Sequence, residues 1–310
     1  MKALRAHRRG GPEVLVVERA PVPVPAAGEV LVAVRAAAIT FDELTWEETW
    51  TRDGTDRTPV IPSHEVSGVI SEIGSGVADF TAGDEVYGLI GFDRDGAAAE
   101  FVTMPAADLA AKPSTVSHVA AAALTLAGLT AWQALVDHAA VQPGEAVLVH
   151  GGAGGVGALA VQLAAILGAR VTATVRSDAR ELVGAFGAQR VIDVRSEAFE
   201  EDGPTYDVVI DTVGGETLDR SFGVLRRGGR LITLSAPPPV GKADEYGITA
   251  TFFIVTPDRD QLAELAALVD GGRLQVQIAQ TFALDTGREA FESGRLPGRR
   301  AGKTVIVVRD

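Results

Sequence analysis

The segment Val149–Gly157 reads Val-His-Gly-Gly-Ala-Gly-Gly-Val-Gly and separates a short apolar run from a longer one. Within it, Gly152, Gly154 and Gly157 have the spacing G-x-G-x-x-G. In this pattern the first glycine permits a tight turn, the second lets the backbone approach a pyrophosphate, and the third lets a helix pack closely on a strand. We therefore predict a dinucleotide site, at the start of a helix, made of Gly152, Ala153, Gly154, Gly155, Val156 and Gly157.

The sequence around this segment alternates between short apolar runs and helical patterns. The runs that predict strands are Ala146–Val149, Arg170–Val175, Arg190–Ile192, Tyr206–Asp211 and Gly229–Ser235. Helices are predicted between them over 154–167, 178–186 and 217–225. Strands that alternate with helices form a parallel sheet covered on both faces. We therefore predict an α/β protein with a doubly wound Rossmann domain.

The end of the second strand indicates which dinucleotide binds. Sites for NAD place Asp or Glu there to hold the ribose hydroxyls. Here Arg176 and Ser177 follow the strand, and Arg180 comes soon after. These three side chains suit a 2′-phosphate, so we predict NADPH. Asp178 is interpreted as the cap of the next helix, and two arginines on an ordinary solvated surface are the alternative.

The rest of the chain predicts a different architecture. Before residue 118, β-branched runs such as Val30–Val34 and Val66–Ile73 alternate with prolines and glycines, which indicates a mostly antiparallel β structure. His118–Ala140 predicts helices with a break near Gly128. Near the C-terminus, Asp260–Asp270 predicts an amphipathic helix whose apolar face carries Leu262, Leu265, Ala266 and Val269.

Composition and charge narrow the function classes. The 310 residues include no cysteine, which excludes a disulfide framework, a thiol nucleophile and a cysteine-based zinc site. The net charge of −13 makes nucleic acid an unexpected partner. No run of about 18 apolar residues is evident, so a membrane span is not expected. The basic N-terminus leads into Gly10-Gly11-Pro12 rather than an apolar stretch, so we expect a cytoplasmic location.

Several short motifs, in this order of domains, resemble the medium-chain dehydrogenase/reductase superfamily. They are Met1-Lys2-Ala3, Gly11–Leu15, Gly28–Val32, Ile61–Glu65, Gly83–Gly88, the glycine segment and Gly302-Lys303. Leu126–Trp132 is similar to the quinone oxidoreductase branch. The resemblance implies a GroES-like catalytic domain over residues 1–122, to which 257–310 return, and a Rossmann domain over 123–256. The glycine segment also fits short-chain dehydrogenases, but no tyrosine is followed four positions later by the lysine those enzymes use.

The zinc-dependent branch of this superfamily is a second comparison. Where its members carry the ligands of a catalytic zinc, this chain has Glu43, His64 and Ala127. Two ligands are too few for zinc, so we predict no metal. The resemblance then implies NADPH-dependent transfer of hydride to a quinone or an α,β-unsaturated carbonyl. A zinc-free alcohol or carbonyl dehydrogenase and a non-catalytic NADPH-binding structural or sensor protein are the alternatives.

A reductase of this kind must hydrogen-bond the substrate oxygen that gains charge. Thr40 stands where quinone reductases of the family often have Asn, and its hydroxyl can donate such a bond. Tyr87 is the second predicted catalytic donor, with a packed structural tyrosine as the alternative. For the cofactor, the resemblance adds Thr130, Ser235, Ala236 and Lys303.

In the family, the segment that corresponds to Thr40–Gly54 borders the substrate pocket. It is unusual here because two tryptophans stand four positions apart among acidic residues. We predict that this segment forms an aromatic wall of the pocket. The alternative for the segment is a helix face packed on the core, and the alternative for His64 is a hydrogen-bonded core residue. The predicted pocket residues are Phe41, Glu43, Trp46, Trp50 and His64.

The family also implies association. The β-rich segment Thr249–Val255 follows the last strand of the parallel sheet. In relatives this edge pairs between subunits, so we predict a homodimer. The alternative is a strand covered by the chain's own tail.

Overall fold

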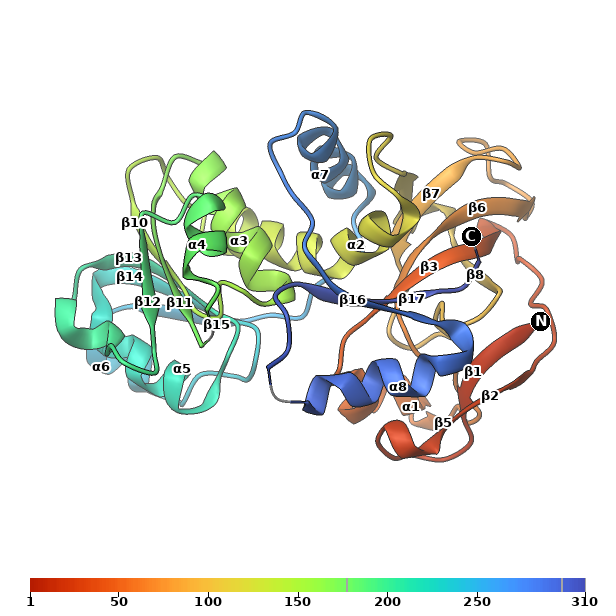
Figure 1. Cartoon of the computed structure of the whole chain (residues 1–310), viewed down its shortest axis with the longest axis horizontal. Helices are drawn as coiled ribbons and strands as arrows, with labels where there is room; N and C mark the ends of the chain where they lie inside the picture. The colour runs from red at the N-terminus through yellow and green to blue at the C-terminus, as the bar shows by residue number, and fades with distance from the viewer. Residues whose placement is uncertain (177, 297, 310) are drawn as a thin grey trace. The chain divides into compact units, whose positions relative to one another are not determined.

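Two large β-sheets, each in its own part of the chain, organise the computed structural model of the protein (Figure 1). The structure describes residues 1–176, 178–296 and 298–309. The chain divides into one unit of residues 1–129 and 256–310 and a second unit of residues 130–255. We call the first unit the β domain and the second the parallel-sheet domain.

The parallel-sheet domain is doubly wound, which confirms the predicted fold class. Its strands pair in the order β12-β11-β10-β13-β14-β15, and every pairing is parallel. The helices α3 and α4 lie against one face and α5 and α6 against the other (Figure 1). The strands are β10 (Ala146–Val149), β11 (Arg170–Val175), β12 (Arg190–Asp193), β13 (Tyr206–Asp211), β14 (Leu225–Thr233) and β15 (Thr249–Phe252). The helices are α3 (Gly155–Ile166), α4 (Arg180–Ala185), α5 (Gly215–Ser221) and α6 (Lys242–Tyr246).

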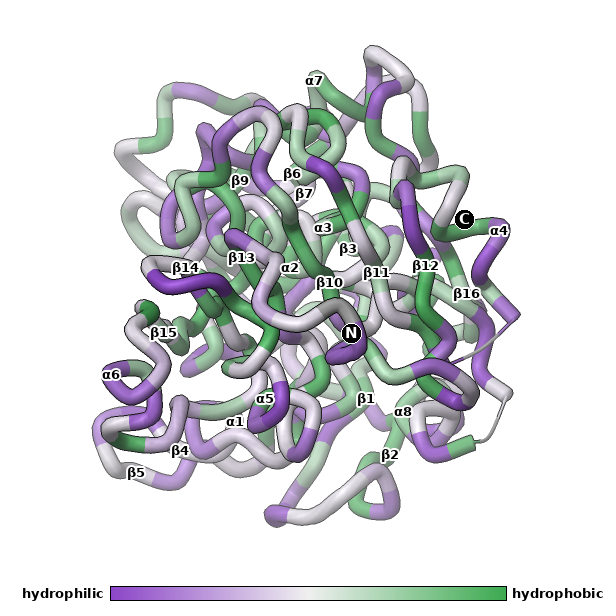
Figure 2. The backbone as a smooth tube through the Cα atoms, turned by 90° about the vertical axis from the view of Figure 1, so that its left-hand side faces the viewer, coloured by the Kyte–Doolittle hydropathy of each residue, from purple (hydrophilic) through white to green (hydrophobic). Residues whose placement is uncertain are grey.

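The centre of this sheet is apolar, as a sheet covered on both faces requires. β10 is hydrophobic along its length in Figure 2, and its Val147, Leu148 and Val149 are fully buried. One predicted cap is wrong. The N-cap of α4 is Ala179, no side chain caps the helix, and Asp178 instead pairs with Arg195 at 2.9 Å.

The β domain is built on a mixed sheet in the order β16-β17-β3-β6-β7-β9, with β8 beside β3. All of its pairings are antiparallel except that of β16 with β17. The strands of the domain are β1 (Lys2–Ala6), β2 (Leu15–Arg19), β3 (Glu29–Ile39), β4 (Thr51–Arg52), β5 (Thr55–Asp56), β6 (Glu65–Ile73), β7 (Glu85–Leu89), β8 (Phe101–Pro105), β9 (Leu109–Ala111), β16 (Ile278–Ala283) and β17 (Lys303–Val307). Its helices include α1 (Glu47–Trp50), α7 (Arg259–Asp270) and α8 (Gly287–Glu292).

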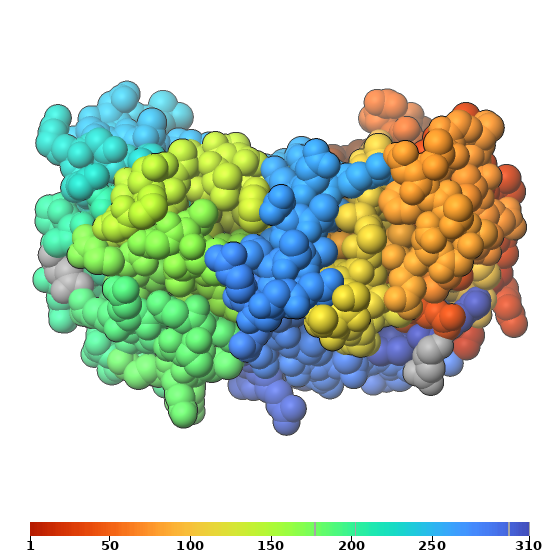
Figure 3. All heavy atoms as spheres, turned by 90° about the horizontal axis from the view of Figure 1, so that it is seen from above, coloured from red at the N-terminus to blue at the C-terminus, as the bar shows by residue number. Residues whose placement is uncertain are grey.

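The helix α2 (His118–Trp132) has no break at Gly128, contrary to the prediction. A Cβ at Gly128 would lie 2.9 Å from Cδ1 of Leu265 on α7, so this glycine serves close helix packing. The amphipathic prediction for α7 is confirmed, because Leu262, Leu265 and Val269 are buried. Asp260, Glu264 and Asp270 of this helix are exposed, and Figure 3 shows the helix at the surface.

The helical stretch His118–His138 is the one place where the described residues are long and apolar enough to cross a membrane. This differs from the prediction that the chain has no such stretch. In the structure 78% of its apolar window is buried inside the protein. Burial of this extent is typical of a core helix, because its apolar surface is already covered by neighbouring elements.

Candidate functional site

The glycine segment forms the turn between β10 and α3. Gly151 has a φ of +72°, in the left-handed region that glycine favours, so the tight-turn role belongs to Gly151 rather than to Gly152. A Cβ on Gly152 would lie 2.9 Å from Cβ of Ala173 on β11. A Cβ on Gly157 would lie 2.1 Å from the carbonyl oxygen of Gly151. Both positions therefore require glycine because the turn, β11 and α3 pack so closely.

The N-terminus of α3 is open to an anion. Gly154 is its N-cap residue, and no side chain caps the helix. Such an end presents unpaired N–H groups and the positive end of the helix dipole. A Cβ on Gly154 would meet the Gly151 carbonyl oxygen at 3.2 Å and no other atom within 4 Å. The turn, completed by the half-buried Ala153, Gly155 and Val156, thus fits the pyrophosphate of a dinucleotide.

One exposed cation follows β11. Arg176 is exposed, and it has no partner among the residues that the structure describes. Arg180 donates to the carbonyl oxygen of Val191 at 2.6 Å and to the Glu197 carboxylate at 2.5 Å. The charge of Arg180 is therefore already compensated. Ser177, the third residue of the prediction, lies outside the described residues. Of the three residues predicted for a 2′-phosphate, Arg176 is the one with a free charge.

The other predicted cofactor residues of the parallel-sheet domain lie on different elements. Thr130 is buried near the end of α2, whereas Ser235 and Ala236 are exposed after β14. Asp211, which is not among the predicted site residues, is a buried acid at the end of β13 that organises the next turn. Its carboxylate accepts hydrogen bonds at 2.9–3.1 Å from the backbone N–H of Val213 and Gly214 and from the Thr233 hydroxyl. An acid at the end of a parallel strand was the available signal.

In the β domain, Thr40, Glu65 and Lys303 meet at one end of three neighbouring strands. Strand β3 lies between β17 and β6, and the register sets Thr304 opposite Ile39. Lys303 Nζ lies 2.5 Å from Glu65 Oε1 and 3.2 Å from Thr40 Oγ1. Thr40 in turn donates to Glu65 Oε1 at 3.2 Å. A predicted catalytic residue is thus in contact with a buried ion pair.

This contact gives Lys303, a predicted cofactor residue, two partners within its own domain. Its side chain is 10% exposed and that of Glu65 only 1%. The ammonium is committed to a carboxylate and a hydroxyl of its own domain, so its charge is not free for a phosphate. Burial raises the pKa of Glu65, while the charge of Lys303 and the hydrogen bonds from Lys303 and Thr40 act in the opposite direction.

Two of the predicted pocket residues, Glu43 and His64, are buried in the same domain. Both oxygens of Glu43 accept from the Ser63 N–H, at 3.1 and 3.2 Å. Burial, together with the charge of Glu65, holds the pKa of Glu43 well above its usual value. Burial lowers the pKa of His64 to about 4, and the charge of Arg57 acts in the same direction.

The expectation of a hydrogen-bonded core histidine is met only in part. Neither ring nitrogen of His64 has a partner in ordinary hydrogen-bond geometry among the described residues, although the Gly91 backbone lies close enough to favour the protonated ring. The ring instead packs edge-on against Phe92, with centroids 5.4 Å apart. At neutral pH the imidazole is therefore a neutral, apolar-packed group.

The aromatic residues after β3 are divided between wall and core. Trp50 is 2% exposed and donates its indole N–H to the Leu44 carbonyl oxygen at 2.9 Å, so it is a core residue. Trp46 is half-buried and packs edge-on against Phe92, with centroids 5.1 Å apart. Phe41 is half-buried beneath the Arg299 guanidinium, 4.3 Å from the ring centre. Phe41 and Trp46 thus keep partly exposed aromatic surface, which Trp50 does not.

Tyr87 does not have the position of a catalytic donor. Its side chain is fully buried, and its hydroxyl donates to the carbonyl oxygen of Leu262 on α7 at 2.5 Å. Burial raises the pKa of this phenol, and the charge of Asp270 acts in the same direction. The alternative of a packed structural tyrosine is the one that the structure supports.

The donor set of the β domain does not fit a catalytic zinc. Zinc in dehydrogenases needs three protein ligands beside an open position. No group of three such side chains is found among the described residues. Ala127, at the third ligand position, is a buried residue without a donor atom, and Glu65 is paired with Lys303. We derive no chemical step through zinc.

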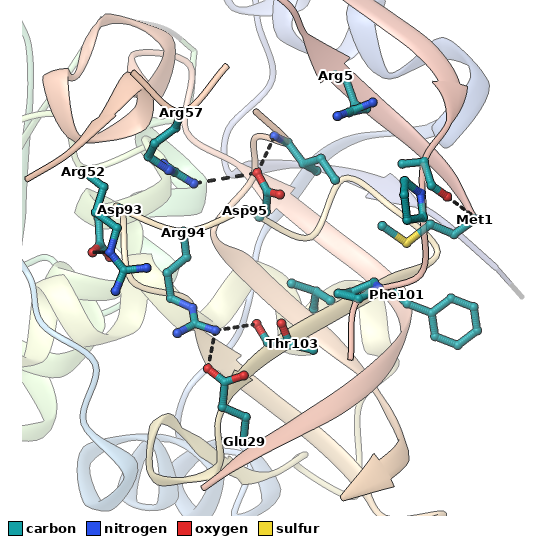
Figure 4. Close-up of a pocket in the computed structure, with 16 residues that line it drawn as sticks. Met1, Arg5, Glu29, Arg52, Arg57, Asp93, Arg94, Asp95, Phe101 and Thr103 are labelled. Atoms are coloured by element: carbon teal, nitrogen blue, oxygen red, sulfur yellow. Dashed lines mark hydrogen bonds and ion pairs between the residues drawn. The ribbon is translucent and has the colours of Figure 1, made fainter. Parts of the chain in front are cut away.

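A separate cavity of about 760 Å³ in the β domain is lined by charged residues that neutralise one another (Figure 4). Arg94 points to Glu29, at 2.6 Å, and Arg57 points to Asp95, at 3.7 Å. Arg57 also donates to the carbonyl oxygens of Glu48 and Thr49. Arg57 thereby holds the segment that follows Trp46, and the ion pairs of Arg57 and Arg94 leave neither guanidinium free.

Two protein-family models match the chain. The alcohol dehydrogenase GroES-like domain matches residues 26–114, and the zinc-binding dehydrogenase model matches residues 186–306. The solved quinone oxidoreductase of Coxiella burnetii is 30% identical, with a TM-score of 0.89 over 100% of this chain and 99% of that chain.

Curated relatives give the same picture. The 2-methylene-furan-3-one reductase of Solanum lycopersicum is 34% identical over 318 residues, which cover 99% of this chain and 79% of the relative. Polyketide synthase GfsB of Streptomyces halstedii is 34% identical over 292 residues, which are 91% of this chain. This chain spans 5% of the length of that synthase.

Proposed function

This chain belongs to the medium-chain dehydrogenase/reductase superfamily, in its quinone oxidoreductase-like branch, and we propose that it reduces a quinone or an α,β-unsaturated carbonyl. As an oxidoreductase of the NAD(P)H-dependent kind, it would use NADPH, and it would act without zinc. The observation that carries the proposal is the incomplete zinc donor set beside a half-buried hydroxyl, that of Thr40. The described residues of this domain can hydrogen-bond a substrate oxygen, but they do not complete a donor set for a metal Lewis acid.

The parallel-sheet domain supplies the cofactor part of the proposal. When bound, NADPH supplies a hydride ion. The uncapped start of α3 would hold its pyrophosphate through backbone N–H groups. Arg176 would hold the 2′-phosphate, because a free guanidinium binds phosphate strongly. The exposed Ser235 and Ala236 would border the other end of the dinucleotide.

The incomplete zinc donor set among the described residues supports the proposed substrate class. An isolated ketone needs its carbonyl polarised during hydride attack, which zinc does in metal-dependent enzymes. A conjugated acceptor spreads the incoming charge to an oxygen distant from the attacked carbon, so one hydrogen-bond donor serves it. The half-buried rings of Phe41 and Trp46 would contact a flat substrate.

A homodimer is also part of the proposal. Strand β15 is the last strand at one edge of the parallel sheet. Such an edge has unpaired backbone groups that a second chain can satisfy. Just after it, Ile254 is 58% exposed. A two-fold pairing of these edges would extend the sheet and cover that side chain.

The test is a comparison of acceptors and cofactors. The purified protein should oxidise NADPH faster than NADH in the presence of quinones or conjugated ketones, and a metal chelator should leave the rate unchanged. Turnover of simple ketones that the chelator abolishes would contradict the zinc-free assignment. Tight NADPH binding without turnover of any acceptor would favour a non-catalytic role.

A further inference from the structure

The ion pair of Lys303 and Glu65 is a buried group of charges for which the fold alone gives no reason. Both side chains lie at least nine-tenths out of solvent. Removing two charges from water costs several kcal/mol per ion in proteins, and apolar residues of similar size often replace such a pair without loss. The third member of the cluster, Thr40, is half-buried and is the member that reaches the surface.

The three hydrogen bonds of the cluster differ in strength. The contact between Lys303 Nζ and Glu65 Oε1 is 2.5 Å long and joins two charges. The bond from the Thr40 hydroxyl to Glu65 Oε1 is 3.2 Å, whereas O–H···O bonds are most often 2.7–2.8 Å. Glu65 therefore depends on Lys303 for its counter-charge, and it loses little when the Thr40 hydroxyl turns away.

Lys303 also acts directly on that hydroxyl. Its ammonium donates to Thr40 Oγ1 at 3.2 Å. A cation that donates to a hydroxyl oxygen draws electron density from the O–H bond, which makes the hydroxyl a stronger donor to a third group. The ammonium occupies one side of the Thr40 oxygen and so limits where the hydroxyl hydrogen can point.

We propose that Lys303, held in place by Glu65, is a positioning residue that polarises the Thr40 hydroxyl and turns it toward the oxygen of a conjugated substrate. The inference rests on the proposed function. Thr40 is then the catalytic residue, because its hydroxyl touches the substrate, and the ammonium acts through it. The cluster thus provides, in weaker form, the positive charge that a metal provides in zinc-dependent relatives.

The chemistry of this step is balanced. Hydride adds to the β-carbon, and the π pair of the carbon–carbon double bond forms a new double bond between the α-carbon and the carbonyl carbon. The π pair of the carbonyl group moves onto its oxygen, which gives an enolate. The Thr40 hydroxyl hydrogen-bonds this oxygen while its charge develops. The α-carbon then takes a proton from solvent. The enone gains one hydride and one proton, and the nicotinamide is oxidised.

The test is a double-mutant cycle on kcat with an enone. Thr40→Val removes the hydroxyl and keeps the shape, and it should lower kcat about tenfold or more, as expected for the loss of a hydrogen bond to a charged group. Thr40→Ser should retain most of the activity. Lys303→Met should lower kcat by a similar factor in the wild-type protein but cause little further loss in the Thr40→Val protein. NADPH binding should be unchanged in all of them.

Lys112→Met is the matched control. Lys112 is as buried as Lys303, lies in the same domain and pairs with Glu85 at 3.4 Å. It should lower thermal stability in the manner of Lys303→Met without reducing kcat in the folded protein. If Lys303→Met lowers kcat by the same factor in the Thr40→Val protein as in the wild type, the proposal is overturned and the proposed function stays intact. A wild-type protein that turns over no conjugated acceptor would contradict both.

Discussion

At the scale of single residues, His64 is buried as a neutral imidazole, and this sets a pH dependence of stability. Its folded-state pKa of about 4 lies below the ordinary value of 6.5. The stability that it contributes is therefore present above pH 6.5 and is lost as the pH falls through 4, because only the unfolded chain takes up the proton in between. The wild-type free energy of unfolding should therefore fall between pH 7 and pH 5, and His64→Phe should make this fall smaller by about 2 kcal/mol. Urea unfolding of both proteins at the two pH values measures these free energies. An equal decrease in the two proteins would contradict a neutral His64 in the folded state.

Arg176 carries the cofactor preference in this account. Arg176→Ala should raise the KM for NADPH by about tenfold or more, because a hydrogen bond to a charged group is worth about 1.5–3 kcal/mol. The KM for NADH should change little. Arg273→Ala is the matched control, since Arg273 is an exposed arginine of the β domain. Steady-state kinetics with both cofactors provide the measurement, and an equal rise for NADH would argue against the 2′-phosphate contact.

At the scale of elements, replacing glycine by alanine should have opposite effects on stability in two helices of the parallel-sheet domain. Gly184 in α4 has open space around its missing Cβ, so Gly184→Ala should stabilise the protein by about 0.5–1 kcal/mol. Gly157→Ala would set a Cβ 2.1 Å from the Gly151 carbonyl oxygen and should destabilise the fold and weaken NADPH binding. Thermal unfolding compares them. Stabilisation by both variants would contradict the packing described for the turn.

How much the sequence could predict also depends on the element. The glycine turn was predictable because its signal is local, between one strand and the next helix. The cluster of Thr40 and Lys303 was not, because 263 positions separate the two residues and only the strand order brings them together. The buried role of Tyr87 was equally hidden, since its hydroxyl meets a carbonyl oxygen 175 positions away. Short apolar stretches such as that around Gly128 show periodicity but not which neighbour they pack against.

At the scale of the whole molecule, the free edge at β15 predicts association. Ile254→Lys should convert the proposed dimer to a monomer, because a charge at a two-fold edge would face its own copy. Val240→Lys is the control, since Val240 is a fully exposed apolar residue of the same domain outside the edge strand. Light scattering on both variants and the wild type provides the measurement. A wild-type monomer at micromolar concentration would contradict the dimer.

The central claim is conjugate reduction by hydride from NADPH, and the position of a deuterium label tests it most directly. The protein would be incubated with 2-cyclohexen-1-one and with NADPH that carries deuterium on both faces of nicotinamide C4. The account predicts the saturated ketone with one deuterium on the β-carbon, in the presence of a metal chelator. Deuterium on the carbinol carbon of an allylic alcohol would contradict the account, because it would show that the carbonyl carbon itself accepts the hydride.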